Sequence, residues 1–554
     1  MPASAVAASL RSVSGDELMA EVSGGPLWPA DLQRRLLHPS GAAAAVLLEP
    51  GSTVLALGTG WPALVASLGA FGGHVTYGDW VYSRMRFETL VHGPADLAVQ
   101  IEPSAALPWD DGVFDRVYVD AGEVDCVLDP AGRRRLLTEV GRVLAADGVA
   151  VVGTRNLLRH LRGDRSARPR AREVLRSVRA FRHPSDRELR RSGLTAAKAL
   201  VPFPRRHRWR WMVPVDGLRA QLRQDRSAHP IARAAGRAGL AAAVVADQYV
   251  LARRGGGQDR DLPTIAERLA GTPELRSPAM LALSDARVAV RGTREFLKIP
   301  LTRDQHRALA REVENITAAR DTPFAPYLAG PARMARYGGL PYAVHPAVPH
   351  GAHEAARADA ALREILLGLP AGETASLRET AVWRRLTTEH GRTEAMDTGM
   401  GPLRRALLET AGDARLPVGP SHGDLHAGNV LLGDDERPVL VDWNRFEHRN
   451  PLLLDALYAA LDARRQQGAP LATALDDFVS GRLGGALAAH ALGLLGTLSV
   501  AEGAALLLLD RAVSYGRRRS RYRPWTIPPL HEAAEMLTPV VVPGGGGAGR
   551  AGAD

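Results

Sequence analysis

Two carboxylates and one amide in the C-terminal half of the chain have the types and spacing that phosphoryl transfer requires. Asp424 and Asn429 lie five residues apart in the stretch His-Gly-Asp-Leu-His-Ala-Gly-Asn, and Asp442 follows the apolar run Pro-Val-Leu-Val. The reaction needs an acidic side chain at the acceptor hydroxyl and oxygen ligands for Mg²⁺, and these residues supply those groups. They predict a kinase catalytic centre; a histidine-rich loop beside an unrelated strand is the alternative.

The five-residue spacing is that of the kinase catalytic loop H-R-D-x-x-x-x-N. The loop and strand resemble the aminoglycoside phosphotransferase and choline kinase families, whose motifs read HGDLHxxN and (I/V)DW. The resemblance implies an α+β, bilobal, protein-kinase-like domain with Asp424 as the base and Asn429 and Asp442 as Mg²⁺ ligands. It also implies that His422 is a structural support. The stretch ending at Asp455 is similar to the DPxxDLA continuation of these families, which implies a structural brace.

Lysine is rare in this chain, so each lysine is informative. Among 70 Lys and Arg residues only Lys198 and Lys298 are lysines. Lys298 lies in a strand-like run about 125 residues before the catalytic loop, where these kinases hold ATP phosphates with a lysine. A following helix offers Glu312, or else Glu314, as its partner. A surface lysine without a role is the alternative.

The glycine-rich loop that covers ATP phosphates in many kinases is not visible in the sequence. Between Met280 and Lys298 the only glycine is Gly292. Backbone N–H groups approach phosphates most closely where glycines remove side chains, so this gap weakens the expectation of ATP binding without excluding it.

The N-terminal half shows a different pattern. An apolar strand at 51–57 enters a turn with Gly58 and Gly60, as in a Rossmann-like nucleotide-binding sheet. This stretch, with residues 107–119 and 136–153, resembles class I methyltransferases that depend on S-adenosylmethionine (SAM). The resemblance runs from about residue 42 to 253 and implies an α/β Rossmann-like methyltransferase domain.

The cofactor loop departs from the pattern of that family. Ala56 occupies the usual acidic position, and Pro62 replaces the third glycine. Asp79, at the end of the second predicted strand, could still bind the SAM ribose, whereas Glu102 and Asp120 have no assigned place. These departures favour a degenerate, structural domain over an active methyltransferase, which stays the alternative.

Positive charge is concentrated in one segment. Residues 155–226 contain 20 Arg and one Lys against six acidic residues, a net charge of about +15, whereas the whole chain carries +10. Interleaved Trp209 and Trp211 could stack on bases or sugars. An anionic partner such as a nucleic acid, a membrane surface or an acidic glycan fits this segment. A solvated arginine-rich face is the alternative.

Length and composition predict a multidomain globular protein. A chain of 554 residues is too long for one ordinary domain. The single cysteine, Cys126, and the absence of a secretory pattern at the N-terminus predict a cytoplasmic location. Residues 483–501 carry no formal charge, yet their small residues predict a buried helix or helix pair and no transmembrane span.

Three histidines lie in the predicted crossing between lobes: His345, His350 and His353. They do not predict a metal site, because prolines there disfavour ligand geometry.

These landmarks divide the chain into five segments. The predicted segments are an N-terminal extension (1–40), the methyltransferase-like domain (41–254), a linker (255–264), the kinase domain (265–540) and a glycine-rich, disordered tail (541–554).

The expected function is Mg²⁺-dependent transfer of phosphate from ATP to a hydroxyl of a sugar, amino sugar, amino alcohol or glycan. The domain order is similar to that of bacterial methyltransferase–kinase proteins that modify the ends of surface polysaccharides. Two alternatives stay open. One is a bifunctional or mainly SAM-dependent methyltransferase in glycan or natural-product biosynthesis, and the other is a non-catalytic binding protein built from two retired enzyme folds.

Overall fold

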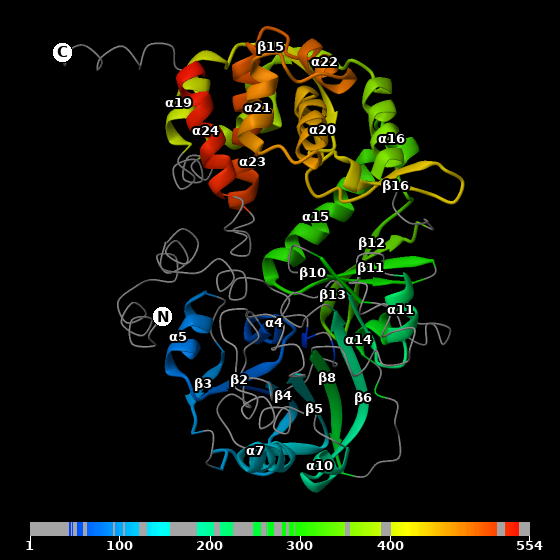
Figure 1. Cartoon of the computed structure of the whole chain (residues 1–554), viewed down its shortest axis with the longest axis vertical. Coiled ribbons are helices and arrows are strands. Elements are labelled where there is room, and N and C mark those ends of the chain that lie inside the picture. The colour runs from blue at the N-terminus through cyan, green and yellow to red at the C-terminus, as the bar shows by residue number, and fades with distance from the viewer. Residues whose placement is uncertain are drawn as a thin grey trace, which may run out of the picture. The chain divides into compact units, whose positions relative to one another are not determined.

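The computed structural model divides the chain into two compact units (Figure 1). The first holds residues 1–306 and 335–344, and the second holds residues 307–334 and 345–554. The division falls inside the region predicted as the kinase, and the domain boundaries drawn from the sequence stay a prediction. The residues described are 44–45, 47, 53–58, 64–91, 95–102, 106–120, 130–155, 186–203, 211–224, 247–255, 262, 264–270, 280–283, 287–292, 294–348, 355–388, 400–517 and 527–541.

The first unit is built on a Rossmann-like sheet. Its parallel strands are β1 (Thr53–Leu57), β2 (His74–Asp79), β3 (Leu97–Gln100), β4 (Phe114–Asp120) and β5 (Leu144–Arg155). Their order in the sheet is β3-β2-β1-β4-β5. The chain adds β2 and β3 on one side of β1 and then adds β4 and β5 on the other side. Their runs of Val, Leu and Ala are buried, as expected of parallel strands covered by helices. The α/β fold predicted for the N-terminal half is confirmed.

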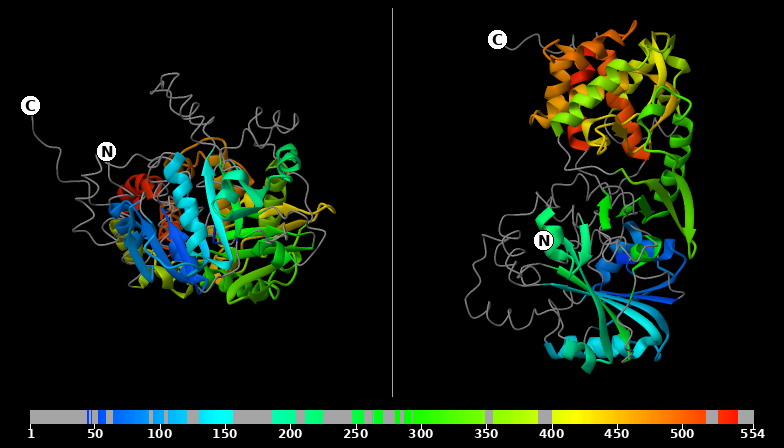
Figure 2. Two further views of the ribbon diagram at one scale, coloured as in Figure 1. Left: turned by 90° about the horizontal axis from the view of Figure 1, so that it is seen from below. Right: turned by 90° about the vertical axis from the view of Figure 1, so that its right-hand side faces the viewer.

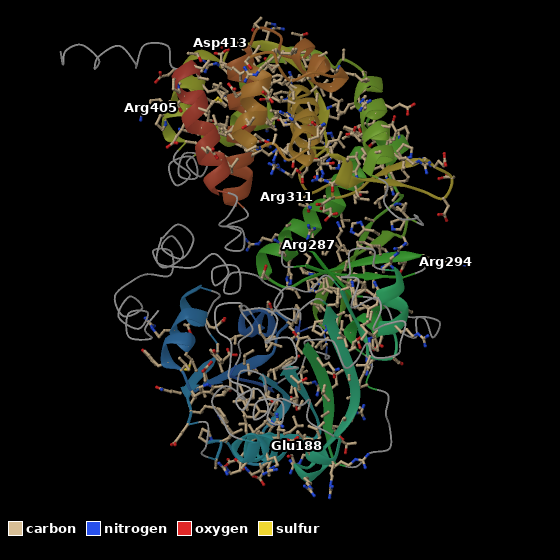
Figure 3. The ribbon with its side chains drawn as sticks, viewed as in Figure 1. Glu188, Arg287, Arg294, Arg311, Arg405 and Asp413 are labelled. Atoms are coloured by element: carbon tan, nitrogen blue, oxygen red, sulfur yellow. The ribbon has the colours of Figure 1, made fainter. Side chains whose placement is uncertain are left out.

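Antiparallel strands and helices complete this part of the sheet. Strand β8 (Asp247–Arg254) pairs with β5, and β6 (Leu194–Phe203) pairs with β8. Helix α7 (Pro130–Val143) buries Leu136, Leu137 and Val140 in the core beneath the sheet. Its Arg133 forms a 3.0 Å ion pair with Glu188 of α10 (Asp186–Arg191), which is labelled in Figure 3. The other helices are α4 (Leu64–Ala70), α5 (Tyr82–Val91), α11 (Leu218–Gln224) and α14 (Ile265–Ala270).

The sheet continues without a break into the strands predicted as the kinase N-lobe. Strand β7 (Trp211–Pro214) pairs with β6 on one side and with β9 (Met280–Leu283) on the other. Beyond β9 follow β10 (Arg287–Arg291), β11 (Glu295–Pro300), β13 (Leu340–Pro346) and β12 (Arg333–Tyr337). Among the described residues, strands β1 to β13 together form one thirteen-stranded sheet. The Oγ of Ser67 on α4 also donates to the Leu301 carbonyl oxygen at 2.6 Å, which adds a second link.

The second unit is mainly helical (Figure 2). A three-stranded sheet of order β14-β15-β18 and a hairpin of β16 and β17 lie among its helices. The helices are α15 (Arg303–Ala319, whose first turn belongs to the first unit), α16 (Ala355–Gly368), α17 (Ala381–Thr387), α19 (Gly401–Thr410), α20 (Leu453–Gln466), α21 (Leu471–Val479), α22 (Ala486–Gly493), α23 (Val500–Arg517) and α24 (Ile527–Val541). The strands and short 3₁₀ turns are β14 (Glu373–Ser376), β15 (Arg415–Ser421), β16 (Val430–Leu432), β17 (Pro438–Leu440), β18 (Glu447–Pro451), η3 (Ala325–Tyr327), η4 (Leu377–Glu379) and η5 (Ala427–Asn429).

Helix α23 is central to the core of the second unit. Its run Leu506–Leu509 is buried on every side, and apolar residues of α19, α20, α21 and α24 pack around it. A helix that is apolar all round belongs in a core, so its sequence accounts for its place. The position of α23 matters for the site because the helix continues to Asp510 and Arg511.

The uncharged stretch 483–501 does not form one long helix. It contains α22 and then a break, and α23 begins at Val500. Within the described part of the chain, no helix combines the length and apolarity needed to cross a membrane. The stretch thus contains one whole helix, α22, and the first two residues of α23, where the sequence predicted a buried helix or helix pair.

Several predicted features lie outside the described residues. They include Gly60, Pro62, Cys126, His350, His353, Trp209, most of the arginine-rich segment 155–226, and the tail from residue 542.

Candidate active site

The predicted catalytic loop connects β15 to η5 in the second unit. Its backbone turns sharply at Gly423, which has φ of +76°. A Cβ at this position would overlap the backbone carbonyl of Arg445, so only glycine lets the two segments approach this closely. The turn brings the loop against the residues that follow Asp442.

Asp455 holds the start of this loop from the first turn of α20. Its Oδ2 accepts hydrogen bonds from the His422 N–H at 2.7 Å and the Ser421 hydroxyl at 2.9 Å. Its Oδ1 accepts from the Gly423 N–H at 2.9 Å. The carboxylate is 3% exposed, so these bonds are shielded from water. These contacts are what a structural brace needs.

His422 joins the loop to the segment that carries Asp442. Its ring is fully buried and its Nε2 lies 3.1 Å from the Val441 carbonyl oxygen. Its Nδ1 accepts the backbone N–H of Asp424 at 3.3 Å. Burial lowers the pKa of His422, and the nearby Asp455 and other carboxylates, which raise it, do not offset this effect. A neutral ring that donates from Nε2 and accepts at Nδ1 satisfies both contacts.

Asn429 and Asp442, the predicted Mg²⁺ ligands, lie next to a pair of neighbouring strands: Asn429 ends η5 just before β16, and Asp442 follows β17. The Asn429 amide donates to the backbone carbonyl of Asp424 at 2.8 Å, and the Val441 N–H donates to the Asn429 carbonyl at 3.0 Å. Asp442 has φ of +67°, which is unusual for a residue other than glycine and is often seen at functional sites. The structure therefore brings Asp424, Asn429 and Asp442 together around one loop.

The chemistry of this donor set fits Mg²⁺. A carboxylate and an amide oxygen are hard ligands, and Mg²⁺ is commonly held by few protein groups plus phosphate oxygens and water. Beside them the amide nitrogen of Asn444 donates to Asp442 Oδ1, while the buried Oδ1 of Asn444 has no hydrogen-bond partner. A buried acceptor left in this state fits a site that is completed by a bound cation or its water. The described residues contain no group of three or more His, Cys, Asp or Glu side chains able to hold a metal.

Sequence reasoning missed a cluster of charged residues beside Asp424. Arg511 of α23 donates from Nη1 to Asp424 Oδ1 at 2.6 Å, and Arg445 Nη1 lies 3.8 Å from the same oxygen. Asp510 pairs with Arg385 at 2.6 Å and with Arg445 at 3.5 Å. Burial raises the pKa of Asp510, but the three arginines outweigh it and hold the pKa below its ordinary value. Arg445 stands three residues after Asp442 and could have been found, whereas nothing near Arg511 marks its role.

The predicted ATP-binding lysine lies on the expected strand. Lys298 is on β11, the third strand of the antiparallel run β9-β10-β11, and its side chain is largely buried. Of its two candidate partners on α15, Glu312 is buried and Glu314 is exposed. Lys298 belongs to the first unit and both glutamates to the second, so the pairing stays a prediction.

Trp80 packs against Gly58 at the start of the predicted SAM loop. Gly58 has φ of +53°, and a Cβ there would overlap the Trp80 indole. Asp79 is fully buried and accepts hydrogen bonds from the Tyr77 hydroxyl and the Val81 N–H, both at 2.8 Å. Each carboxylate oxygen of Asp79 thus accepts one hydrogen bond from within the fold.

Comparison with known proteins bears on both halves. Residues 281–490 match the family model described as "Phosphotransferase enzyme family", a range that contains Lys298, Asp424, Asn429 and Asp442. No curated protein matches the chain. The C-terminal region is thus phosphotransferase-like, and the sequence resemblance to aminoglycoside phosphotransferases is confirmed.

Solved structures that resemble part of the chain include SAM-dependent methyltransferases. A TehB-like one from Corynebacterium glutamicum is 14% identical and covers 39% of this chain and 88% of its own, with a TM-score of 0.24. One from Methanosarcina mazei is 16% identical and covers 39% and 97%, with a TM-score of 0.21. One from Thermotoga maritima is 15% identical and covers 40% and 91%, with a TM-score of 0.25.

Proposed function

We propose that the C-terminal region transfers the γ-phosphoryl group of ATP to a hydroxyl group. The observation that carries the proposal is the convergence of Asp424, Asn429 and Asp442 around one braced loop. The match of residues 281–490 to a phosphotransferase family supports it.

Each residue has a role in this reaction. Asp424 accepts or orients the proton of the attacking hydroxyl, and Lys298 steadies the ATP phosphates. Asn429 and Asp442 would hold Mg²⁺, which would supply positive charge to the phosphate oxygens. Because charge is spread over several oxygens in the transition state, positioning and electrostatic stabilisation supply most of the rate enhancement.

The acceptor is a small polyol, amino sugar, amino alcohol or glycan end, and the reaction takes place in the cytoplasm. This part of the proposal rests on the resemblance of the loop motif to aminoglycoside and choline kinases and on the single cysteine. The arginine-rich segment 155–226 is proposed to bind an anionic partner, because its charge of about +15 exceeds that of the whole chain.

The N-terminal half is proposed to be structural. The indole of Trp80 lies over Gly58, and Asp79 is already hydrogen-bonded inside the fold. The sheet of this half carries the strand of Lys298 through the β7–β9 pairing. Its contribution to phosphoryl transfer is therefore to support the ATP-binding strands.

Thermal unfolding with each cofactor tests this division of roles. A ligand at about 100 times its Kd stabilises the state that binds it by about 2.7 kcal/mol. We expect Mg-ATP to raise the melting temperature and SAM to leave it unchanged. Asp442→Ala should reduce the Mg-ATP shift, whereas Asp413→Asn, at an exposed ion pair with Arg378, should retain it. A shift with SAM and none with Mg-ATP would reverse the assignment.

A further inference from the structure

Helix α23 directs two consecutive charged residues toward the catalytic loop. Asp510 and Arg511 are 4% and 5% exposed at the end of its apolar run. Charged residues are seldom this buried, because leaving water is costly for an ion unless good partners replace it. Apolar side chains would fill this buried position equally well, so packing alone does not explain why Asp510 and Arg511 are charged.

Arg511 has two partners that fix its orientation. Its Nη1 donates to Asp424 Oδ1 at 2.6 Å, a short charge-assisted hydrogen bond. Its guanidinium carbon lies 3.4 Å from the centre of the Tyr458 ring on α20. Stacking on a tyrosine face holds the planar group in one orientation while the amino end reaches the carboxylate.

Asp510 reaches the same carboxylate through a second arginine. It pairs with Arg385 and with Arg445, and Arg445 lies 3.8 Å from Asp424 Oδ1. Arg385 is held in turn by Glu447 on β18. Helix α23 thus contacts the Asp424 side chain directly through Arg511 and indirectly through Asp510 and Arg445.

We propose that Arg511 is a positioning residue that holds the Asp424 carboxylate in the orientation needed to receive the acceptor hydroxyl. This inference rests on the proposed phosphotransferase function. A base must lie within hydrogen-bond reach of the proton it takes, and a misplacement of about 1 Å can cost about 100-fold in rate.

Steady-state kinetics separate this role from a structural one. The assay follows γ-labelled ATP with Mg²⁺ and a panel of sugars, amino sugars and amino alcohols. In Arg511→Met, which keeps the aliphatic length and removes the charge, we expect kcat to fall at least tenfold while KM for Mg-ATP stays within twofold. Arg511→Lys should recover part of the loss. Arg405→Met, at an exposed arginine of α19 labelled in Figure 3, should behave as wild type.

A double-mutant cycle tests the contact without any need for activity. Denaturant midpoints are measured for Asp424→Asn, Arg511→Met and the double variant. If Arg511 holds Asp424, the midpoint shift caused by Asp424→Asn is smaller in the Arg511→Met background than in wild type. Additive shifts, or an Arg511→Met variant with wild-type kcat, would overturn the positioning role. A wild-type protein that transfers no phosphate while the midpoints remain non-additive would instead overturn the proposed function.

Discussion

At the scale of single residues, His422 shows how the candidate site is held together without a charge. Its buried, neutral ring accepts the N–H of Asp424 and donates to the carbonyl of Val441. A protonated ring would lose the acceptor at Nδ1 and place a charge in the core, so burial and hydrogen bonding favour the same state. One buried ring therefore links the catalytic loop to the segment that carries Asp442.

Asp455 provides the residue-scale prediction about stability. In Asp455→Asn the side chain keeps its shape, but an NH₂ group replaces an oxygen that accepts hydrogen bonds. One N–H or hydroxyl of residues 421–423 then loses its partner in a buried place, so we expect a loss of about 2 kcal/mol in the free energy of unfolding. Turnover should fall because the loop that carries Asp424 is released.

Chemical denaturation with a parallel turnover assay measures both effects. Asp413→Asn is the matched control, because Asp413 is exposed and pairs only at the surface among its described contacts. An Asp455→Asn variant that unfolds at the wild-type denaturant concentration would show that Asp455 is not a brace.

The sequence revealed the residues of the site that lie close together in the chain. Asp424, Asn429 and Asp442 fall within one short stretch, where spacing alone suggests their meeting. Arg511 lies 87 residues beyond Asp424 and reaches it only because α23 packs in the core. No local pattern encodes such a contact, since it depends on how helices far apart in the chain are packed.

At the scale of elements, the pairing of β7 with β9 is the feature least visible in the sequence. Strands β1, β2 and β11 were predictable from apolar runs and turns. The linker at 255–264 stays a prediction, and the sequence did not predict that Met212 pairs with Met280 and Trp211 with Leu281. Which two edge strands meet is decided by non-local hydrogen bonds, which periodicity does not report.

Removal of the N-terminal half tests this junction. In a shortened chain that starts at residue 255, β9 loses its partner β7, and Leu301 loses the hydrogen bond from Ser67. We expect faster amide exchange in β9, β10 and β11 than in the whole protein, while amides of α20 and α23 stay protected. Hydrogen exchange followed by mass spectrometry measures the difference. Equal protection of β9–β11 in the two chains would show that the junction does not support these strands.

At the scale of the whole molecule, a Rossmann-like sheet is combined with a phosphotransferase-like region. In the N-terminal half Trp80 packs against Gly58 and Asp79 accepts a hydrogen bond from Tyr77, whereas Asp455 braces the loop of Asp424. If the N-terminal half is structural, as proposed, the two halves of the chain have kept different parts of their enzyme-like patterns. A fold can persist as a support after its own site is lost, because packing and catalysis depend on different residues.

Transfer of labelled phosphate from ATP is the measurement that tests phosphotransferase activity most directly. With Mg²⁺ and a panel of hydroxyl compounds, the wild-type protein should label at least one acceptor. Asp424→Asn, which removes the base and keeps its shape, should lower the rate about 100-fold or more, and Asp413→Asn should keep the wild-type rate. Undiminished labelling by the Asp424→Asn protein would contradict the assignment of the site.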